Sequence, residues 1–322
     1  MSSSLFRTFL EAETASGFRH FYALHRRSMD TVLSVDPAAV LPALLHDQKR
    51  PARLIAWHSV YSPSTLVGLA DYDNRCAWIH PQYFSAGFPG LDPKADGVGP
   101  VHGPGCPWPS LRQELKACLM GALLARTEAE QHQPTDSGML TAVVEEWIHQ
   151  YLSPLGPSTT GDDTHFFGVP LTPEGPYSLF LDETFSSLEE SVHLIACCHR
   201  DASRLLRRFG EEALLRGYSV QYFHDALEPA TINHLVLPER RLGLTHAEAP
   251  HCAPPGKHAR YLTLGSPLPT RAHAEWWPIV QQFYSRAWQI MESMRAFMFE
   301  EVREPARPPG TPQSLDVSVQ AP

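Results

Sequence analysis

Residues 53–81, RLIAWHSVYSPSTLVGLADYDNRCAWIHP, align without a gap onto residues 219–247, SVQYFHDALEPATINHLVLPERRLGLTHA. Identities between the two stretches include His58 with His224, Pro63 with Pro229, Thr65 with Thr231, and His80 with His246. A match at a fixed offset indicates an internal duplication, and a duplication sets the architecture before any single element is considered. The chain is therefore expected to contain two similar units.

The match continues upstream of these stretches. TASGF, with Thr14 and Gly17, corresponds to TPEGP, with Thr172 and Gly175. Each unit is thus expected to begin with a T-x-x-G turn and to continue through an apolar strand, a helix, a second strand and a third.

The second copy shows its local structure most clearly. VHLIACC, residues 192–198, is an uninterrupted apolar run, which is typical of a strand buried on both faces in a parallel sheet. A helix is expected over residues 201–216, with Gly217 as its stop. In the first copy the strand is TVLSV, residues 31–35, and Asp36 begins a shorter helix. Ligands of such sheets lie beyond the carboxyl ends of the strands, so the end of this strand is the place to look for a site.

The remaining segments are a Pro/Gly-rich loop over residues 86–110 and helices over 111–130, 139–152 and 278–302. The apolar stripe of the last helix is expected to pack on its own domain. Residues 304–322 are rich in Pro, Ser and Gly without periodicity, so a disordered tail is expected there. The predicted organisation is a first unit over residues 1–160, containing the loop and a helical insert, and a second unit over 161–303.

The composition of the chain limits the classes of function that it can have. The 322 residues suffice for two domains, and the net charge of -9 carries no long run of one sign, so binding to nucleic acid has no support. The six cysteines show no metal-finger spacing, which favours a reducing compartment. The N-terminus does not resemble a signal peptide, and no run of about 18 apolar residues occurs. A cytoplasmic protein without membrane contact is expected.

Several stretches together resemble a family of uncharacterised bacterial proteins, described as ATPases or nucleotide kinases, that consist of two fused P-loop NTPase units. The clearest stretch is residues 205–251, which contains the turn EPATI at 228–232 and the closing Ala249, Pro250 and His251. ASGF at 15–18 and TPEGP at 172–176 resemble the family's entries to its two units. The resemblance implies an α/β fold of two tandem P-loop NTPase-like units, with parallel sheets flanked by helices.

The phosphate-binding loop that the resemblance implies is missing from both units. Its chemistry needs glycine N–H groups that wrap the phosphates, a lysine that reaches them and a hydroxyl that holds Mg²⁺. Residues 197–203, CCHRDAS, and 34–40, SVDPAAV, contain neither glycine nor lysine, and Asp201 and Asp36 would place negative charge there. Where the resemblance implies an acidic metal ligand at the end of the third strand, the chain has His80 and His246. ATP with Mg²⁺ is therefore disfavoured, and no cofactor is predicted.

The remnant of the loop in the second unit supplies the candidate site residues His199, Arg200, Asp201 and Ser203. A catalytic set could be drawn from them, but Asp and Ser at the start of a helix usually cap its backbone. Arg200 beside a helix N-terminus is a candidate for binding a small anion, with Asp201 opposing it. These positions are expected to lie in a solvent-facing loop, so that alanine at all of them would leave folding nearly intact.

The histidines offer two further hypotheses. His199, His224 and His246 end neighbouring strands, with Cys197, Cys198, His251 and Cys252 as possible neighbours, but the spacing is not local and no metal site is predicted. The duplicated His58 and His224 either take part in chemistry or fix the turn that follows them by a buried hydrogen bond.

Three functions follow from these observations. The leading hypothesis is a degenerate P-loop NTPase-like protein that is noncatalytic or weakly ligand-binding and has a scaffolding or regulatory role, with an intact paralogue or another protein as partner. The first alternative is a divergent nucleotide-binding ATPase or kinase that uses residues 199–203 as a nonstandard loop. The second is a metal-dependent enzyme that uses the histidine cluster.

Overall fold

The computed structural model describes residues 4–46, 53–80, 107–131, 137–153, 161–195, 198–247, 253–264 and 271–300. The first unit comprises β1 (Ser4–Thr8), β2 (Glu11–Thr14), β3 (Gly17–His20), α1 (Tyr22–Arg27), β4 (Thr31–Ser34), α2 (Pro37–His46), β5 (Arg53–Ser59), β6 (Ser62–Asp71) and β7 (Cys76–Ile79). The second unit comprises β8 (Asp163–Phe167), β9 (Leu171–Thr172), β10 (Gly175–Pro176), α6 (Leu179–Ser186), β11 (Glu190–Ile195), α7 (His199–Leu215), β12 (Val220–His224), β13 (Ile232–Leu237), the 3₁₀ turn η1 (Pro238–Arg240), β14 (Leu242–His246) and β15 (His258–Thr263).

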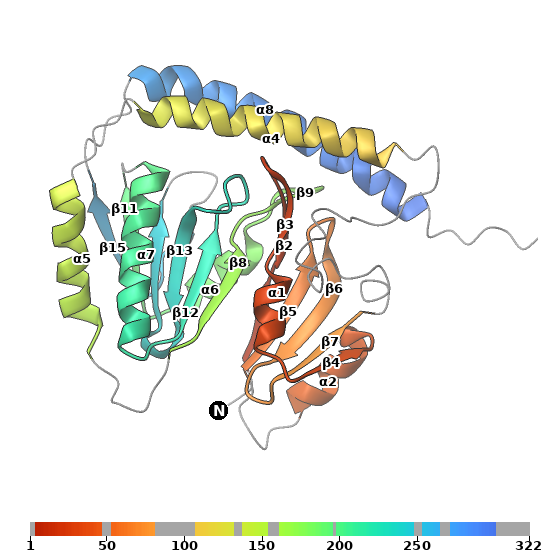
Figure 1. Cartoon of the computed structure of the whole chain (residues 1–322), viewed down its shortest axis with the longest axis horizontal. Helices are drawn as coiled ribbons and strands as arrows, with labels where there is room; N and C mark the ends of the chain where they lie inside the picture. The colour runs from red at the N-terminus through yellow and green to blue at the C-terminus, as the bar shows by residue number, and fades with distance from the viewer. Residues whose placement is uncertain are drawn as a thin grey trace, which may run out of the picture.

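Three longer helices complete the chain. α4 (Trp108–Gln131) and α5 (Ser137–Tyr151) follow the first unit, and α8 (Arg271–Glu300) follows the second. α4 and α8 lie side by side across one end of both units, whereas α5 packs beside α7 (Figure 1). Both helices of the predicted insert therefore contact elements that follow the first unit in sequence.

The two sheets share one strand order, as two copies of one unit would. The order is β1-β5-β6-β7-β4 in the first and β8-β12-β13-β14-β11-β15 in the second, where β15 is an added edge strand. In each sheet one strand, β6 or β13, runs antiparallel to both neighbours, and the other neighbouring pairs are parallel. The chain is thus α/β with mostly parallel strands.

The expectation of parallel sheets is wrong at β6 and β13, and loop length explains why. Only two residues, Val60 and Tyr61, join β5 to β6, and residues 238–241 join β13 to β14. Parallel neighbours need a crossover of a dozen or more residues, so such short links permit only antiparallel pairing. The apolar run in the second copy forms a strand as predicted up to Ile195, and β11 pairs in parallel with both β14 and β15, whereas Cys198 caps α7.

The T-x-x-G turns lie in the hairpins β2–β3 and β9–β10. Thr14 Oγ1 accepts a hydrogen bond from the Ser16 N–H, and Thr172 Oγ1 accepts one from the Glu174 N–H, each at 3.1 Å. Gly175 adopts a φ of 101°, which explains why glycine closes the second turn. The strands that precede these turns, β1 and β8, were not predicted.

The hydrophobic core lies in layers. α7 and α5 cover the outer face of the second sheet, and α2 covers the outer face of the first. A third cluster joins the inner faces of both sheets with α6, so the two units bury apolar surface against each other.

Reciprocal aromatic pairs connect the units. Phe9, after β1, forms an antiparallel bridge with Phe167 at the end of β8. The ring of Phe9 lies 5.0 Å from that of Phe180 in α6, and the ring of Phe167 lies 4.7 Å from that of Phe21 before α1. The contact is therefore built in the same way from both sides, as in a two-fold dimer.

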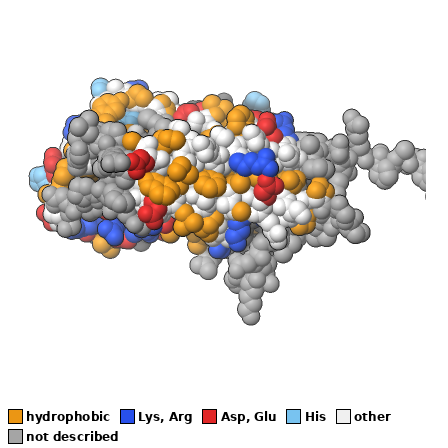
Figure 2. Space-filling model, turned by 90° about the horizontal axis from the view of Figure 1, so that it is seen from above, with side chains coloured by type: hydrophobic (Ala, Val, Ile, Leu, Met, Phe, Trp, Pro, Cys, Tyr) orange, Lys and Arg blue, Asp and Glu red, His pale blue; other side chains and the backbone are white. Residues whose placement is uncertain are grey.

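α4 and α8 run antiparallel to each other, and the side of the molecule that they cover carries hydrophobic side chains between acidic and basic ones (Figure 2). Arg286 donates to Glu114, while further along α4 a Cβ at Gly121 would lie 2.5 Å from the ring of Phe283, so only glycine permits this approach. The apolar stripe of α8, including Ile290 and Met291, packs on α4 and on residues of both units, rather than on its own unit alone.

Candidate functional site

The start of α7 lies beyond the carboxyl end of β11, where the sequence placed the site. His199, Asp201 and Ser203 are buried, with 2%, 6% and 7% of their surface exposed, whereas the Arg200 side chain is half exposed. The prediction of a solvent-facing loop is therefore wrong, because these residues form the first turn of a helix that packs on the sheet. Alanine at all of them would remove buried hydrogen bonds.

Cys198 caps α7. Its Sγ accepts a hydrogen bond from the Asp201 N–H and donates one to Asp201 Oδ2 at 3.0 Å. Burial, together with the hydrogen bond to Asp201, raises the pKa of the Cys198 thiol to about 12. A thiol of this kind is not a nucleophile at neutral pH. The N-cap of α7 is thus Cys198, which lies before the residues predicted to cap the helix, and Asp201 supplies the N–H that is capped. Ser203 Oγ accepts from the Ile232 N–H, which fixes α7 to β13.

Glu130, from the end of α4, is a site residue that sequence reasoning missed. Its Oε1 lies 2.7 Å from His199 Nδ1 and also accepts from the His199 N–H. The ring of His246, at the end of β14, lies 4.6 Å from that of His199 at 78°. Burial raises the pKa of the Glu130 carboxyl. No local signal could have found Glu130, because 69 residues separate it from His199.

A second buried contact ties α4 to the turn after β12. The Arg126 guanidinium donates to Asp225, and the two side chains are 4% and 0% exposed. Glu228 lies 3.4 Å from Arg126 and 3.9 Å from Arg200. The charges at this edge are thus compensated by protein groups. Arg200 lies near the Glu228 carboxylate, which argues against Arg200 as the candidate site for a small anion.

His58 and His224 fix the turns that follow them, which is the second of the two alternatives for this pair. His58 Nδ1–H donates to Pro63 O at 2.8 Å, and His224 Nδ1–H donates to Pro229 O at 2.6 Å. Burial lowers the pKa of His58 to about 4 and that of His224 to about 3. Both rings are therefore neutral at pH 7, and the repeated Pro provides the acceptor in each copy.

The three proposed metal ligands do not come together. His199 and His246 are in contact, but His224 Nε2 lies 2.8 Å from Nδ1 of His165 and its ring packs on Phe21. Within the described ranges, no group of three His, Cys, Asp or Glu side chains could hold a metal. Cys197, His251 and Cys252 lie outside these ranges. His80 follows β7 in the other sheet, and its N–H donates to Val67 O.

The corresponding edge of the first unit is built differently. Asp36, which begins α2, is exposed, and its Oδ1 accepts from the Ala38 N–H at 2.9 Å. It is a surface helix cap, and no buried charge cluster surrounds it among the described residues.

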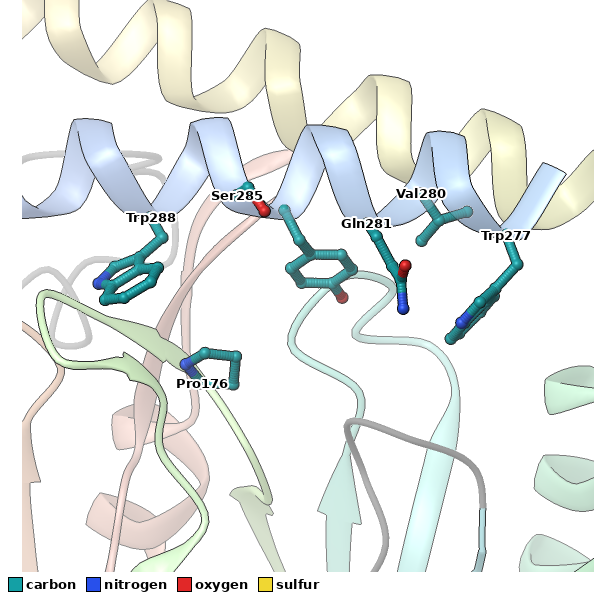
Figure 3. Close-up of a pocket in the computed structure, with 7 residues that line it drawn as sticks. Pro176, Trp277, Val280, Gln281, Ser285 and Trp288 are labelled. Carbon is teal, nitrogen blue, oxygen red and sulfur yellow. The ribbon is translucent and has the colours of Figure 1, made fainter.

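A groove of about 370 Å³ runs beneath α8 (Figure 3). It is lined by Pro176 of β10 and by one stripe of α8: Trp277, Val280, Gln281, Tyr284, Ser285 and Trp288. Trp288 Nε1–H donates to Pro173 O at 3.0 Å, which fixes its indole over the β9–β10 hairpin. Burial raises the pKa of Tyr284, so its hydroxyl stays protonated. The groove is mainly aromatic, with one amide and hydroxyl groups as polar contacts.

Comparisons with protein-family models, with curated proteins and with solved structures found no match. No described helix is both long and apolar enough to cross a lipid bilayer. The family resemblance and the cytoplasmic location therefore stay predictions.

Proposed function

We propose that this chain is noncatalytic and acts as a scaffolding or regulatory protein by binding a protein partner. The observation that carries the proposal is the buried contact between His199 and Glu130, because it fills the edge where a phosphate loop would stand in a P-loop NTPase. Glu130 adds a carboxylate to a place that would have to receive a triphosphate.

The other groups at this edge support the same function. The Cys198 thiol is protonated at neutral pH. Asp201 is hydrogen-bonded to Cys198 at the start of α7, and Ser203 is hydrogen-bonded to β13. General base and nucleophilic catalysis both need a group that can reach a substrate. These side chains instead hold elements of the fold together.

A P-loop origin, as the resemblance implies, is part of this proposal. The strand, helix and next strand β11, α7 and β12 follow the order that such a unit requires, and β11 and β12 point in the same direction. The antiparallel β13 between them and the missing loop would then be later changes. The partner would be an intact paralogue or another protein.

A thermal-shift series tests the proposal against both alternatives. The melting temperature is measured with ATP, ADP and GTP, each with and without Mg²⁺, and with Zn²⁺ after dialysis against a chelator. We expect shifts below 1 °C, because ligand binding to the folded state alone would raise the melting temperature. A shift of several degrees with Mg-ATP that Arg200→Ala abolishes would support a divergent ATPase or kinase, and one with Zn²⁺ that His246→Ala abolishes would support a metal-dependent enzyme.

A further inference from the structure

The groove beneath α8 has a repeating aromatic floor. Trp277, Tyr284 and Trp288 lie seven and four residues apart, so they occupy one face of the helix at intervals of about 10 Å and about 6 Å along its axis. Val280 between them is buried, whereas Trp288 keeps 40% of its surface exposed. In Figure 3, Trp277 and Trp288 mark the two ends of the groove, and Pro176 lies across from Trp288.

This lining matches the chemistry that recognises proline. Pro-rich segments in the polyproline II conformation dock into grooves lined by aromatic rings, with a few polar side chains that bind the solvated backbone carbonyls. Gln281 and Ser285 are exposed on the rim of this groove and can donate such hydrogen bonds. A polyproline II turn advances about 9 Å, which is close to the interval between Trp277 and Tyr284.

The chain carries a matching sequence directly after α8. Residues 304–312 read EPARPPGTP and contain two P-x-x-P repeats, Pro305 to Pro308 and Pro309 to Pro312. A repeat of this kind places both prolines on one side of a polyproline II helix.

The reach is sufficient within one molecule. α8 ends at Glu300, twelve residues beyond Trp288, which is about 18 Å of helix. Pro308 lies eight residues after Glu300, and eight extended residues span about 26 Å. The second repeat can therefore extend from Trp288 toward Trp277.

We propose that the aromatic groove beneath α8 binds residues 305–312 of the same chain, so that the chain's own P-x-x-P repeats cover the surface. The inference rests on the proposed function in one respect: the covered groove is the surface that a protein partner uses. A tether of this length gives an effective concentration on the order of 1 mM, so a segment with a Kd of about 100 µM in trans would occupy the groove about 90% of the time.

A labelled peptide measures this occupancy. Fluorescein-PARPPGTP is titrated with the full-length chain and with a full-length variant in which Pro305, Pro308, Pro309 and Pro312 are replaced by alanine. Fluorescence anisotropy should give a Kd about tenfold lower for the four-alanine variant, because its groove is free of competition in cis. In that variant, Trp288→Ala should abolish binding. Ser285→Trp, which fills the groove from an exposed position, should do the same if Trp288→Ala disturbs folding. Leu124→Ala, on the exposed face of α4, is the control that should leave binding unchanged.

Each other outcome overturns the inference. If the peptide binds neither chain, or binds with Trp288→Ala and Ser285→Trp in place, the groove is not a proline site. Equal Kd values for the full-length chain and the four-alanine variant would mean that the chain's own segment does not cover the groove. None of these results bears on nucleotide binding, so the proposed function would fail separately, through a positive thermal shift.

Discussion

The turns after β5 and β12 show how the two units have diverged. In the first, Ser59 Oγ accepts from the Tyr61 N–H at 3.3 Å, and in the second Asp225 Oδ1 accepts from the Leu227 N–H at 2.6 Å. The same turn hydrogen bond thus occurs in both copies, and in the second copy Asp225 also binds the buried Arg126 of α4. The comparison shows that a polar side chain at this position is enough to form the turn. The negative charge of Asp225 serves the contact with Arg126 of α4.

The helices α4 and α8 also differ at equivalent positions. Both contain Trp-Pro, at 108–109 and 277–278, and aligning these dipeptides places Arg126 opposite Arg295. Arg126 is buried against Asp225, whereas Arg295 is half exposed and lies 3.8 Å from the exposed Glu174. Both arginines thus contact carboxylates of the second unit, but only the contact from α4 is buried.

Asp225→Ala should give the largest difference between the units. The change leaves the Arg126 guanidinium buried without its main partner, which typically costs about 3–5 kcal/mol. The matched change Ser59→Ala removes one neutral hydrogen bond, at about 1 kcal/mol. Urea unfolding of both variants measures the two values. Equal values would mean that the buried pair does not distinguish the second unit.

Acid should destabilise the protein through its buried histidines. Burial lowers the pKa of His224 to about 3 and that of His25 and His58 to about 4. The unfolded chain binds these protons near pH 6.5 and the folded chain does not, so the free energy of unfolding falls as the pH drops below about 6.5. Each histidine contributes at most about 1.4 kcal/mol per pH unit, which integrates to about 2 kcal/mol between pH 6.5 and 4.5.

His224→Asn isolates one of these contributions. Urea unfolding at pH 7.0, 5.5 and 4.5 should show a smaller pH dependence for this variant than for the parent chain. His58→Asn tests the equivalent position of the first unit and should reduce the dependence similarly, because both rings are buried. An unchanged dependence in both variants would place the acid sensitivity elsewhere.

His199→Ala should cost about 2 kcal/mol, because it leaves the buried Glu130 carboxylate without the imidazole it contacts. His199→Gln, which keeps a donor, should recover part of the loss. Both are measured by urea unfolding at pH 7. A cost near zero for His199→Ala would restore the expectation that the remnant of the loop is a tolerant surface segment.

Asp36→Ala should have the smallest effect, about 0.5–1 kcal/mol, since it removes one exposed cap at the start of α2. Asp36→Ser, which can still cap, is the control and should be close to neutral. A cost above that of His199→Ala would reverse the ranking of the two edges.

The sequence predicted those features that depend on local pattern or on the repeat. The apolar run of β11, the helix α7 and the T-x-x-G turns are where their residue types place them. The antiparallel direction of β6 and β13 follows from the short loops beside them, whereas the family resemblance implied parallel sheets. Loop length was therefore the better guide to strand direction.

The site could be predicted only in part. His199 and His246 meet because both follow strands of one sheet. Glu130 and Arg126 reach this edge from α4, and that contact depends on how a helix from the middle of the chain packs on α8. Burial of His199 and Asp201 follows from the same packing, which no periodicity within residues 197–203 could indicate.

The most direct test of the closed edge is isothermal titration calorimetry of the folded full-length protein with ATP, ADP and GTP, each with and without Mg²⁺. We predict no heat of binding, because Glu130 and His199 occupy the place of a phosphate loop. Micromolar binding of any of these nucleotides would contradict the account and would show that the second unit still works as a nucleotide site.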